Sequence, residues 1–152
     1  MKSTSPQKQL DRFIDKYTPQ IAARARAAIA NMQTRLPGAI RMVFDNYNAL
    51  VVGFSPTEKP GDAIFSIALY PRWVTLFFLQ GAGLRDRRRL LKGKGKVVRQ
   101  IVLDEANDLD KPEIVDLIDR ALESDCIAMD DSCEGRLIIQ SISENQRPRR
   151  PR

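Results

Sequence analysis

The chain has 152 residues, 43% of them hydrophobic and 29% charged, which is typical of a single globular domain. No apolar run approaches the roughly 20 residues of a membrane-spanning helix, and the first residues include no apolar leader, so we expect a cytoplasmic protein with no membrane partner. Histidine is absent, which removes the usual general base and the commonest ligand of transition metals. A conventional hydrolase or zinc enzyme is therefore disfavoured, and we expect a protein without catalytic residues or cofactor.

The net charge of +6 is unevenly distributed along the chain. Residues 1–103 hold 18 basic and 6 acidic residues, residues 104–134 hold 2 basic and 12 acidic residues, and residues 135–152 hold 5 basic and 1 acidic residue. Such asymmetry is informative about partners. Cys126 and Cys133 have no metal-site spacing, and they indicate two buried thiols in a reducing compartment.

Two helices are predicted at the start of the chain. Apolar residues at i, i+3, i+4 and i+7 within residues 7–17 predict a short amphipathic helix. Thr18 and Pro19 are typical of an N-cap followed by the first helical position, and this second helix is expected to end near Arg35, before Pro37-Gly38.

Alternating apolar residues then predict four strands, near residues 40–45, 50–54, 63–70 and 72–79. The loops between them are short, which favours antiparallel hairpins. The fourth strand is apolar on both faces, so either both faces are covered or the second face meets another chain in a homodimer. We expect one face of this strand to pack against a helix through Trp73, Phe77, Ile114, Leu117 and Ile118.

The second half of the chain predicts a strand, a helix and a strand. Val97 to Leu103 alternates as a fifth strand. Asp110-Lys111-Pro112-Glu113 has the pattern of a capping box, and apolar spacing continues the helix to about Ser124. Arg136 to Ile142 is expected to be an edge strand.

The resulting fold class is α+β. We expect an antiparallel sheet of about five to six strands, with the N-terminal and C-terminal helices packed on one face. Residues 1–143 form one domain in this interpretation. Residues 144–152 are polar and interrupted by proline, so a flexible Arg/Pro-rich tail is predicted.

The most distinctive segment is GAGLRDRRRLLKGKGK, residues 81–96, called here the basic segment. It combines four glycines and one acid, Asp86, with seven basic residues, and we expect Asp86 to cap a short helical turn that carries Leu90 and Leu91 and ends at Gly93. Glycine backbone and positive charge together could hold a phosphate or another anion, although no P-loop or dinucleotide pattern is present. A solvated, purely structural loop is the alternative. The candidate anion-binding or nucleic-acid-binding residues are Arg85, Arg87, Arg88, Arg89, Lys92, Lys94 and Lys96.

Several stretches resemble the YdhG-like family of uncharacterised bacterial domains, some of which are linked to the frataxin-like fold. The resemblance is carried by VTLFFLQGAGLRDRRRLLKGKGKVVRQIVL (Val74 to Leu103), by the acidic turn DEANDLD, and by the helix EIVDLIDRALE. It implies a frataxin-like sandwich without an assigned reaction. The family pattern of an Asp, a leucine pair and Gly-x-Gly-Lys is matched by Asp86, Leu90, Leu91, Gly93, Gly95 and Lys96.

A metal site is a weaker alternative. Carboxylates suit hard cations, but the acidic stretch lacks the EF-hand pattern, and an outward-facing charged surface is the simpler interpretation. The resemblance implies iron binding by carboxylates of the first helix, yet Asp11 and Asp15 stand there beside Arg12 and Lys16, which departs from that pattern. The candidate metal residues are Asp104, Glu105, Asp108 and Asp110.

Three functions therefore stay open. The first is a non-enzymatic domain that binds a protein partner or a small anionic ligand through the basic segment. The second is a nucleic-acid-associated protein that uses the basic segment and the arginines of the tail. The third is an iron or divalent-cation carrier. The distribution of charge on the folded surface discriminates between them.

Overall fold

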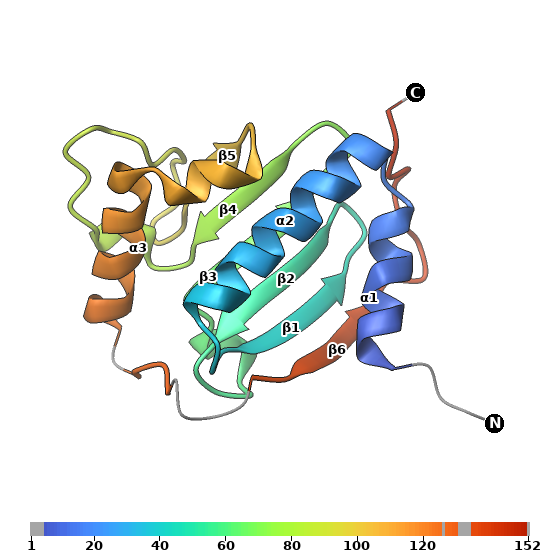
Figure 1. Ribbon diagram of the computed structural model, residues 1–152, viewed down its shortest axis with the longest axis horizontal. Helices are drawn as coiled ribbons and strands as arrows, with labels where there is room; N and C mark the ends of the chain where they lie inside the picture. Colours follow the sequence, from blue (N-terminus) through green and yellow to red (C-terminus); the bar gives the residue numbers. More distant parts are fainter. Residues whose placement is uncertain (1–4, 126, 131–134, 152) are drawn as a thin grey trace.

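The computed structural model describes residues 5–125, 127–130 and 135–151. Cys126 and Cys133 lie outside these residues. Within the described part, no helix is long and apolar enough to cross a membrane. The described residues form three α-helices and a six-stranded sheet, arranged as in Figure 1: α1 (Pro6–Asp15), α2 (Pro19–Arg35), β1 (Ile40–Asp45), β2 (Leu50–Ser55), β3 (Phe65–Leu69), β4 (Val74–Phe78), β5 (Arg99–Leu103), α3 (Pro112–Ser124) and β6 (Leu137–Ile142).

The fold class is α+β, as the sequence predicted, but the sheet is mixed. Its strand order is β5-β4-β3-β2-β1-β6, and β1 to β5 pair as successive antiparallel neighbours. β6 runs parallel to β1, so the expectation of an antiparallel sheet is wrong at this edge. The physical reason is that β6 does not follow its neighbour through a hairpin. It follows α3, which lies at the opposite side of the sheet (Figure 1), so no short turn forces it to run antiparallel to β1.

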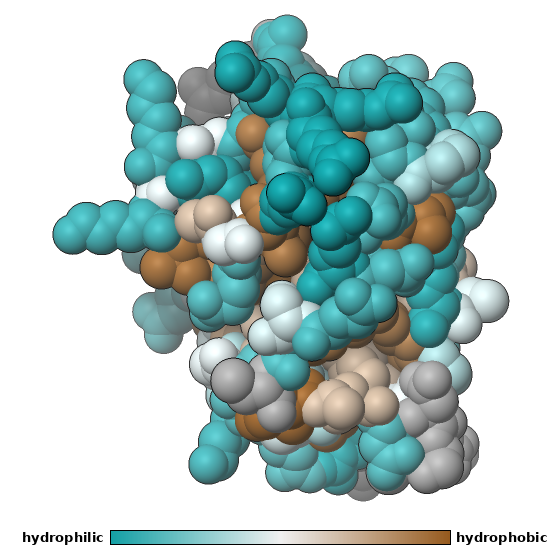
Figure 2. All heavy atoms as spheres, turned by 90° about the vertical axis from the view of Figure 1, so that its left-hand side faces the viewer, coloured by the Kyte–Doolittle hydropathy of each residue, from teal (hydrophilic) through white to brown (hydrophobic). Residues whose placement is uncertain are grey.

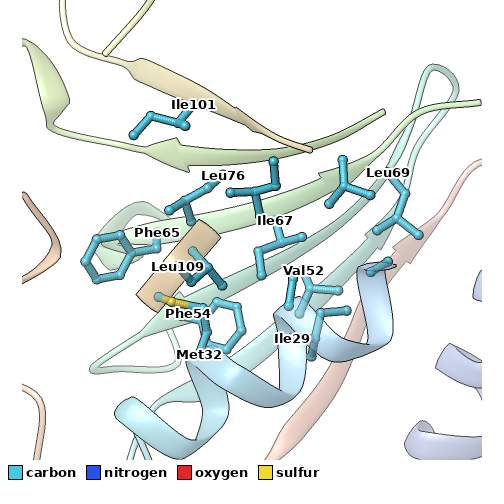
Figure 3. Close-up of a cluster of buried hydrophobic side chains, with 14 of the residues drawn as sticks. Ile29, Met32, Val52, Phe54, Phe65, Ile67, Leu69, Leu76, Ile101 and Leu109 are labelled. Carbon is cyan, nitrogen blue, oxygen red and sulfur yellow. The ribbon is translucent and has the colours of Figure 1, made fainter. Parts of the chain in front are cut away.

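One face of the sheet forms the hydrophobic core with the helices. In Figure 1, α1 and α2 lie in front of the sheet, and Figure 3 shows Ile29 and Met32 of α2 beside the buried side chains of the strands. The residues of the strands that face the helices occupy alternate positions, which the strand register aligns across the sheet. One such row consists of Val43, Val52, Ile67, Leu76 and Ile101, all buried.

The prediction for the fourth strand named the wrong face. Val74, Leu76 and Phe78 of β4 join the core with Ile114, Leu117 and Ile118 of α3. Trp73, which is 44% exposed, and the partly buried Phe77 lie on the other face instead. An apolar strand fits either register, because a shift by one residue exchanges the two faces.

The second face of the sheet carries side chains that no described helix covers. Phe44, Val51 and Phe77 are partly exposed there, and Val102 of β5 is 46% exposed. Small residues such as Ala68, between them, are buried by their neighbours within the sheet. A homodimer through this face stays a prediction.

The predicted N-cap of α2 is confirmed, and that of α3 is not. Thr18 caps α2, since its Oγ1 accepts a hydrogen bond from the backbone N–H of Ile21 at 3.3 Å. The predicted cap of α3 is wrong: the N-cap is Lys111, without a side-chain hydrogen bond. The carboxylate of Asp110 pairs with the guanidinium of Arg35 in α2 at 2.8 Å and does not cap α3.

The C-terminal segment, residues 144–151, packs against the domain rather than extending from it. The guanidinium of Arg149 is buried and donates a hydrogen bond of 2.9 Å to the carboxylate of Asp45, which is itself buried at the end of β1. The backbone N–H of Arg147 donates to the carbonyl of Tyr47 at 2.9 Å. Composition did not predict these contacts, because the sequence does not reveal that Asp45 is a buried partner; the flexibility of residues 144–152 stays a prediction. Arg152 lies outside the described residues.

Candidate functional site

The basic segment connects the end of β4 to the start of β5, at the left of Figure 1. Figure 2 views this end of the molecule and shows strongly hydrophilic side chains gathered over its upper part. All seven predicted basic residues of the segment are exposed. None of the seven forms an ion pair with a described residue.

Asp86 organises the centre of the basic segment. Its two carboxylate oxygens accept hydrogen bonds from the backbone N–H groups of Leu90, at 3.0 Å, and Leu91, at 2.8 Å. Arg89 adopts a φ of 52°, in the left-handed region that residues other than glycine seldom occupy. The result is a tight turn instead of the predicted helical turn, but Asp86 holds it as expected, and both leucines pack partly against the core.

We expect Asp86→Ala to loosen this turn without unfolding the domain. Two charge-assisted hydrogen bonds to backbone N–H groups are lost, and the strained Arg89 then has less to hold it. Amide hydrogen exchange at Leu90 and Leu91 should accelerate by about tenfold, which corresponds to ~1.4 kcal/mol. Exchange in β3 should stay unchanged as the control. Unaltered protection at both leucines would show that Asp86 does not hold the turn.

The later part of the segment is held by the edge of the sheet. Lys92 and Gln100 of β5 exchange two backbone hydrogen bonds, of 2.8 and 2.9 Å. Gly93 has a φ of 118°, which suits glycine alone, and a Cβ at Gly81 would lie 2.6 Å from the Cβ of Arg99. The glycines of this segment therefore serve its turns and its packing, and the basic side chains project from a loop with a defined course.

Helix α3, which carries several acidic residues, lies close to one side of the basic segment. A cavity of about 280 Å³ between them is lined by Arg85, Arg87 and Arg88 of the segment and by Glu113 and Asp116 of α3, among others. Asp116 pairs with Arg120 of its own helix at 2.8 Å. The carboxylates reduce the positive potential in this cavity. The field available to an anion is therefore strongest on the side of the segment that faces away from α3.

Two of the four predicted metal residues, Asp108 and Asp110, are engaged in structural contacts. Burial raises the pKa of Asp108, but hydrogen bonds from the backbone of Glu105, from Lys111 and from the backbone of Asp104 outweigh burial and lower the pKa overall. The carboxylate of Asp110 is bound to Arg35, while Asp104 and Glu105 are exposed. Among the described residues, no group of three or more acidic or cysteine side chains is arranged to hold a metal ion.

The acids of α1 are likewise engaged locally. Asp15 pairs with Arg26 of α2 at 2.7 Å, and Asp11 accepts a hydrogen bond from the side chain of Gln7 at 3.1 Å. Neighbouring basic residues therefore neutralise part of the negative charge that an iron site would need.

The structure also gathers aromatic and basic side chains that the sequence analysis did not connect. Tyr70 and Trp73 lie in the β3–β4 turn with their ring centroids 5.5 Å apart. They line a cavity together with Arg147 and Arg150 of the C-terminal segment. The only signal in the sequence is the adjacency of Arg72 and Trp73. The contribution of residues more than seventy positions away could not be read from it.

The basic segment and the C-terminal arginines do not form one continuous surface. The segment follows the last residue of β4, whereas Arg147 and Arg150 lie beside the turn that precedes the first residue of β4. The two groups are therefore separated by the length of the strand.

No family model, no curated protein and no solved structure matches the chain. The resemblance to the YdhG-like family and the frataxin-like sandwich stay predictions.

Proposed function

We propose that this protein is a non-enzymatic binding protein whose basic segment holds a phosphate-bearing ligand. The observation that carries the proposal is the exposure of seven basic side chains, none of which forms an ion pair with a described acid, on a loop with a defined course. Exposed side chains of this kind gain binding free energy chiefly by replacing the counterions of a phosphate polymer. A nucleic acid is accordingly the ligand to test first.

The structure of the basic segment favours a binding role over the alternative of a purely solvated loop. Asp86, its single acid, is engaged with the backbone N–H groups of Leu90 and Leu91, so its charge is directed inward. Arg87, Arg88 and Arg89 are consecutive and lie within this turn. A set of neighbouring charges fits several phosphates along a backbone better than one isolated ion, and it implies little preference for base sequence.

Changing Arg87, Arg88 and Arg89 together to Ala should weaken binding to duplex DNA and reduce its dependence on salt. Each phosphate contact contributes roughly −0.9 to the slope of log K against log salt concentration, so the slope should flatten by about two to three units if all three arginines contact phosphates. The measurement is fluorescence anisotropy of a labelled duplex across a salt series.

The matched control removes the same charge from elsewhere. Lys8, Arg12 and Lys59 are exposed and form no ion pair with a described residue, and changing all three to Ala lowers the net charge equally. This control should leave the slope nearly unchanged. Absence of binding at low salt, or equal effects of the two triple changes, would contradict a role for the basic segment.

A further inference from the structure

A second cavity lies at the opposite end of β4 from the basic segment. It has a volume of about 590 Å³ and lies between the β1–β2 turn, the β3–β4 turn and the C-terminal segment. We call it the aromatic cleft. Its lining includes the rings of Tyr70 and Trp73 and, from the C-terminal segment, Arg147, Pro148, Arg150 and Pro151.

The aromatic cleft offers a flat ring face to a ligand. Trp73 is 44% exposed, and its ring is tilted by 32° against that of Tyr70, with a centroid separation of 5.5 Å. The backbone N–H of Tyr70 donates to the carbonyl of Trp73 at 2.9 Å, which closes the turn and keeps the two residues close together. A partly exposed tryptophan on a fixed turn costs little conformational entropy on binding, and it suits stacking against a planar ring.

The charge of the aromatic cleft is positive and has no carboxylate to oppose it. Arg72, Arg147 and Arg150 line the cleft, and no Asp or Glu does so among the described residues. Arg150 donates to the backbone carbonyl of Lys16 at 3.1 Å, and the guanidinium of Arg147 lies 5.7 Å from the ring centroid of Tyr47. These contacts position two guanidinium groups without neutralising them.

The docking of the C-terminal segment is what builds this site. Buried Arg149 is bound to Asp45, and it lies between Pro148 and Arg150, so its anchorage brings both neighbours to the turns of the sheet. The two prolines restrict the backbone on either side. The cleft therefore has a stable wall that belongs to the chain itself.

We propose that the aromatic cleft binds single-stranded nucleic acid by stacking one unpaired base on Trp73, with the neighbouring phosphates at Arg72, Arg147 and Arg150. An apolar ligand would not need three guanidinium groups, and a free phosphate would not use the rings. An unpaired nucleotide requires both features together, whereas the bases of a duplex are stacked on each other and cannot reach the tryptophan. This proposal does not depend on the role of the basic segment, which lies roughly 20 Å away along β4 at ~3.3 Å per residue.

Trp73 is the only tryptophan of the chain, so its fluorescence reports the cleft directly. A titration with a ten-nucleotide single strand of deoxythymidine should quench this fluorescence in a saturable way. A blunt-ended duplex of ten base pairs, which has no unpaired base, and inorganic phosphate serve as comparisons, and each should leave the fluorescence nearly unchanged. Equal quenching by the duplex or by phosphate would overturn the proposal, and so would binding of the single strand without quenching.

Variants separate stacking from charge. Trp73→Ala should weaken binding of a labelled single strand by about five- to 150-fold, which is the range for loss of one stacked base, while Trp73→Phe should retain most of the affinity. Phe77→Leu removes a ring from the same face of β4 outside the cleft, and it should have no effect. Circular dichroism checks that each variant is folded. A Trp73→Ala variant that binds the single strand as tightly as the unchanged protein would overturn the proposal.

The arginines give an independent readout. Changing Arg147 and Arg150 together to Ala should flatten the salt dependence of single-strand binding by about 1.4 units, at roughly 0.7 for each contact. Binding of duplex DNA through the basic segment is measured separately and should not respond to Trp73→Ala. The two sites can therefore fail independently: a protein that binds duplex but shows no Trp73-dependent single-strand binding loses only this proposal.

Discussion

Arg149→Met is expected to lower the free energy of unfolding by about 3–5 kcal/mol, although the residue lies three positions from the C-terminus. The side chains of Arg149 and Asp45 are 4% and 1% exposed, and their charged groups lie 2.9 Å apart. Removing the guanidinium leaves the carboxylate of Asp45 buried, with only the more distant ammonium of Lys16 at 3.5 Å. Urea denaturation followed by circular dichroism measures the loss.

Two further variants make this prediction specific. Arg150→Ala removes the next arginine in the chain, which is exposed and donates hydrogen bonds to the backbone carbonyls of Lys16 and Asp15, and it should cost less than about 1 kcal/mol. Combining Arg149→Met with Asp45→Asn should recover much of the stability, because no unpaired charge is then buried. If Arg149→Met is as stable as Arg150→Ala, the C-terminal segment is not held by this ion pair.

Phe78→Ala should lower the free energy of unfolding by about 3–5 kcal/mol. Phe78 is 1% exposed, and its ring meets that of Phe65 edge-on with centroids 5.5 Å apart. The ring also packs in the same core as Ile114 and Leu117 of α3. Thermal and urea denaturation should both show the loss, since truncation leaves a cavity that the fixed strands cannot close.

Phe77 is the matched control, because it is the same residue one position earlier on the opposite face. It is partly exposed, so Phe77→Ala should cost at most about half as much as Phe78→Ala at low protein concentration. If a second copy covers this face, the loss from Phe77→Ala will increase with protein concentration, and gel filtration will show a dimer that the variant lacks. Equal losses at both positions, independent of concentration, would show that the assignment of faces is wrong.

The position of most elements could be predicted because their signals are local. Thr18 and Pro19 mark the start of α2 whatever surrounds them, since capping and a fixed φ act within one turn. Short loops between alternating segments likewise predicted the antiparallel order of β1 to β4. The cap of α3 was missed because Asp110 has a stronger partner, Arg35, that is far away in the sequence.

One of the two candidate sites could be predicted from local sequence signals, and the other could not. The exposure of the basic segment and the anchoring role of Asp86 could be predicted, because charged runs remain solvated and an aspartate readily accepts hydrogen bonds from nearby N–H groups. The aromatic cleft could not be predicted from the sequence, because Trp73 and Arg150 come together only when the C-terminal segment packs beside the β3–β4 turn.

Sequence alone determined the α+β class, the element order and the positive charge of the segment after β4, since each depends on interactions within a few residues. Only the tertiary structure decided three further features: which face of β4 enters the core, the parallel direction of β6, and the docking of Arg149 on Asp45. The physical reason is common to all three. A strand with two apolar faces, an edge without a hairpin and a buried ion pair each depend on a partner that lies far along the chain, and local pattern carries no information about that partner.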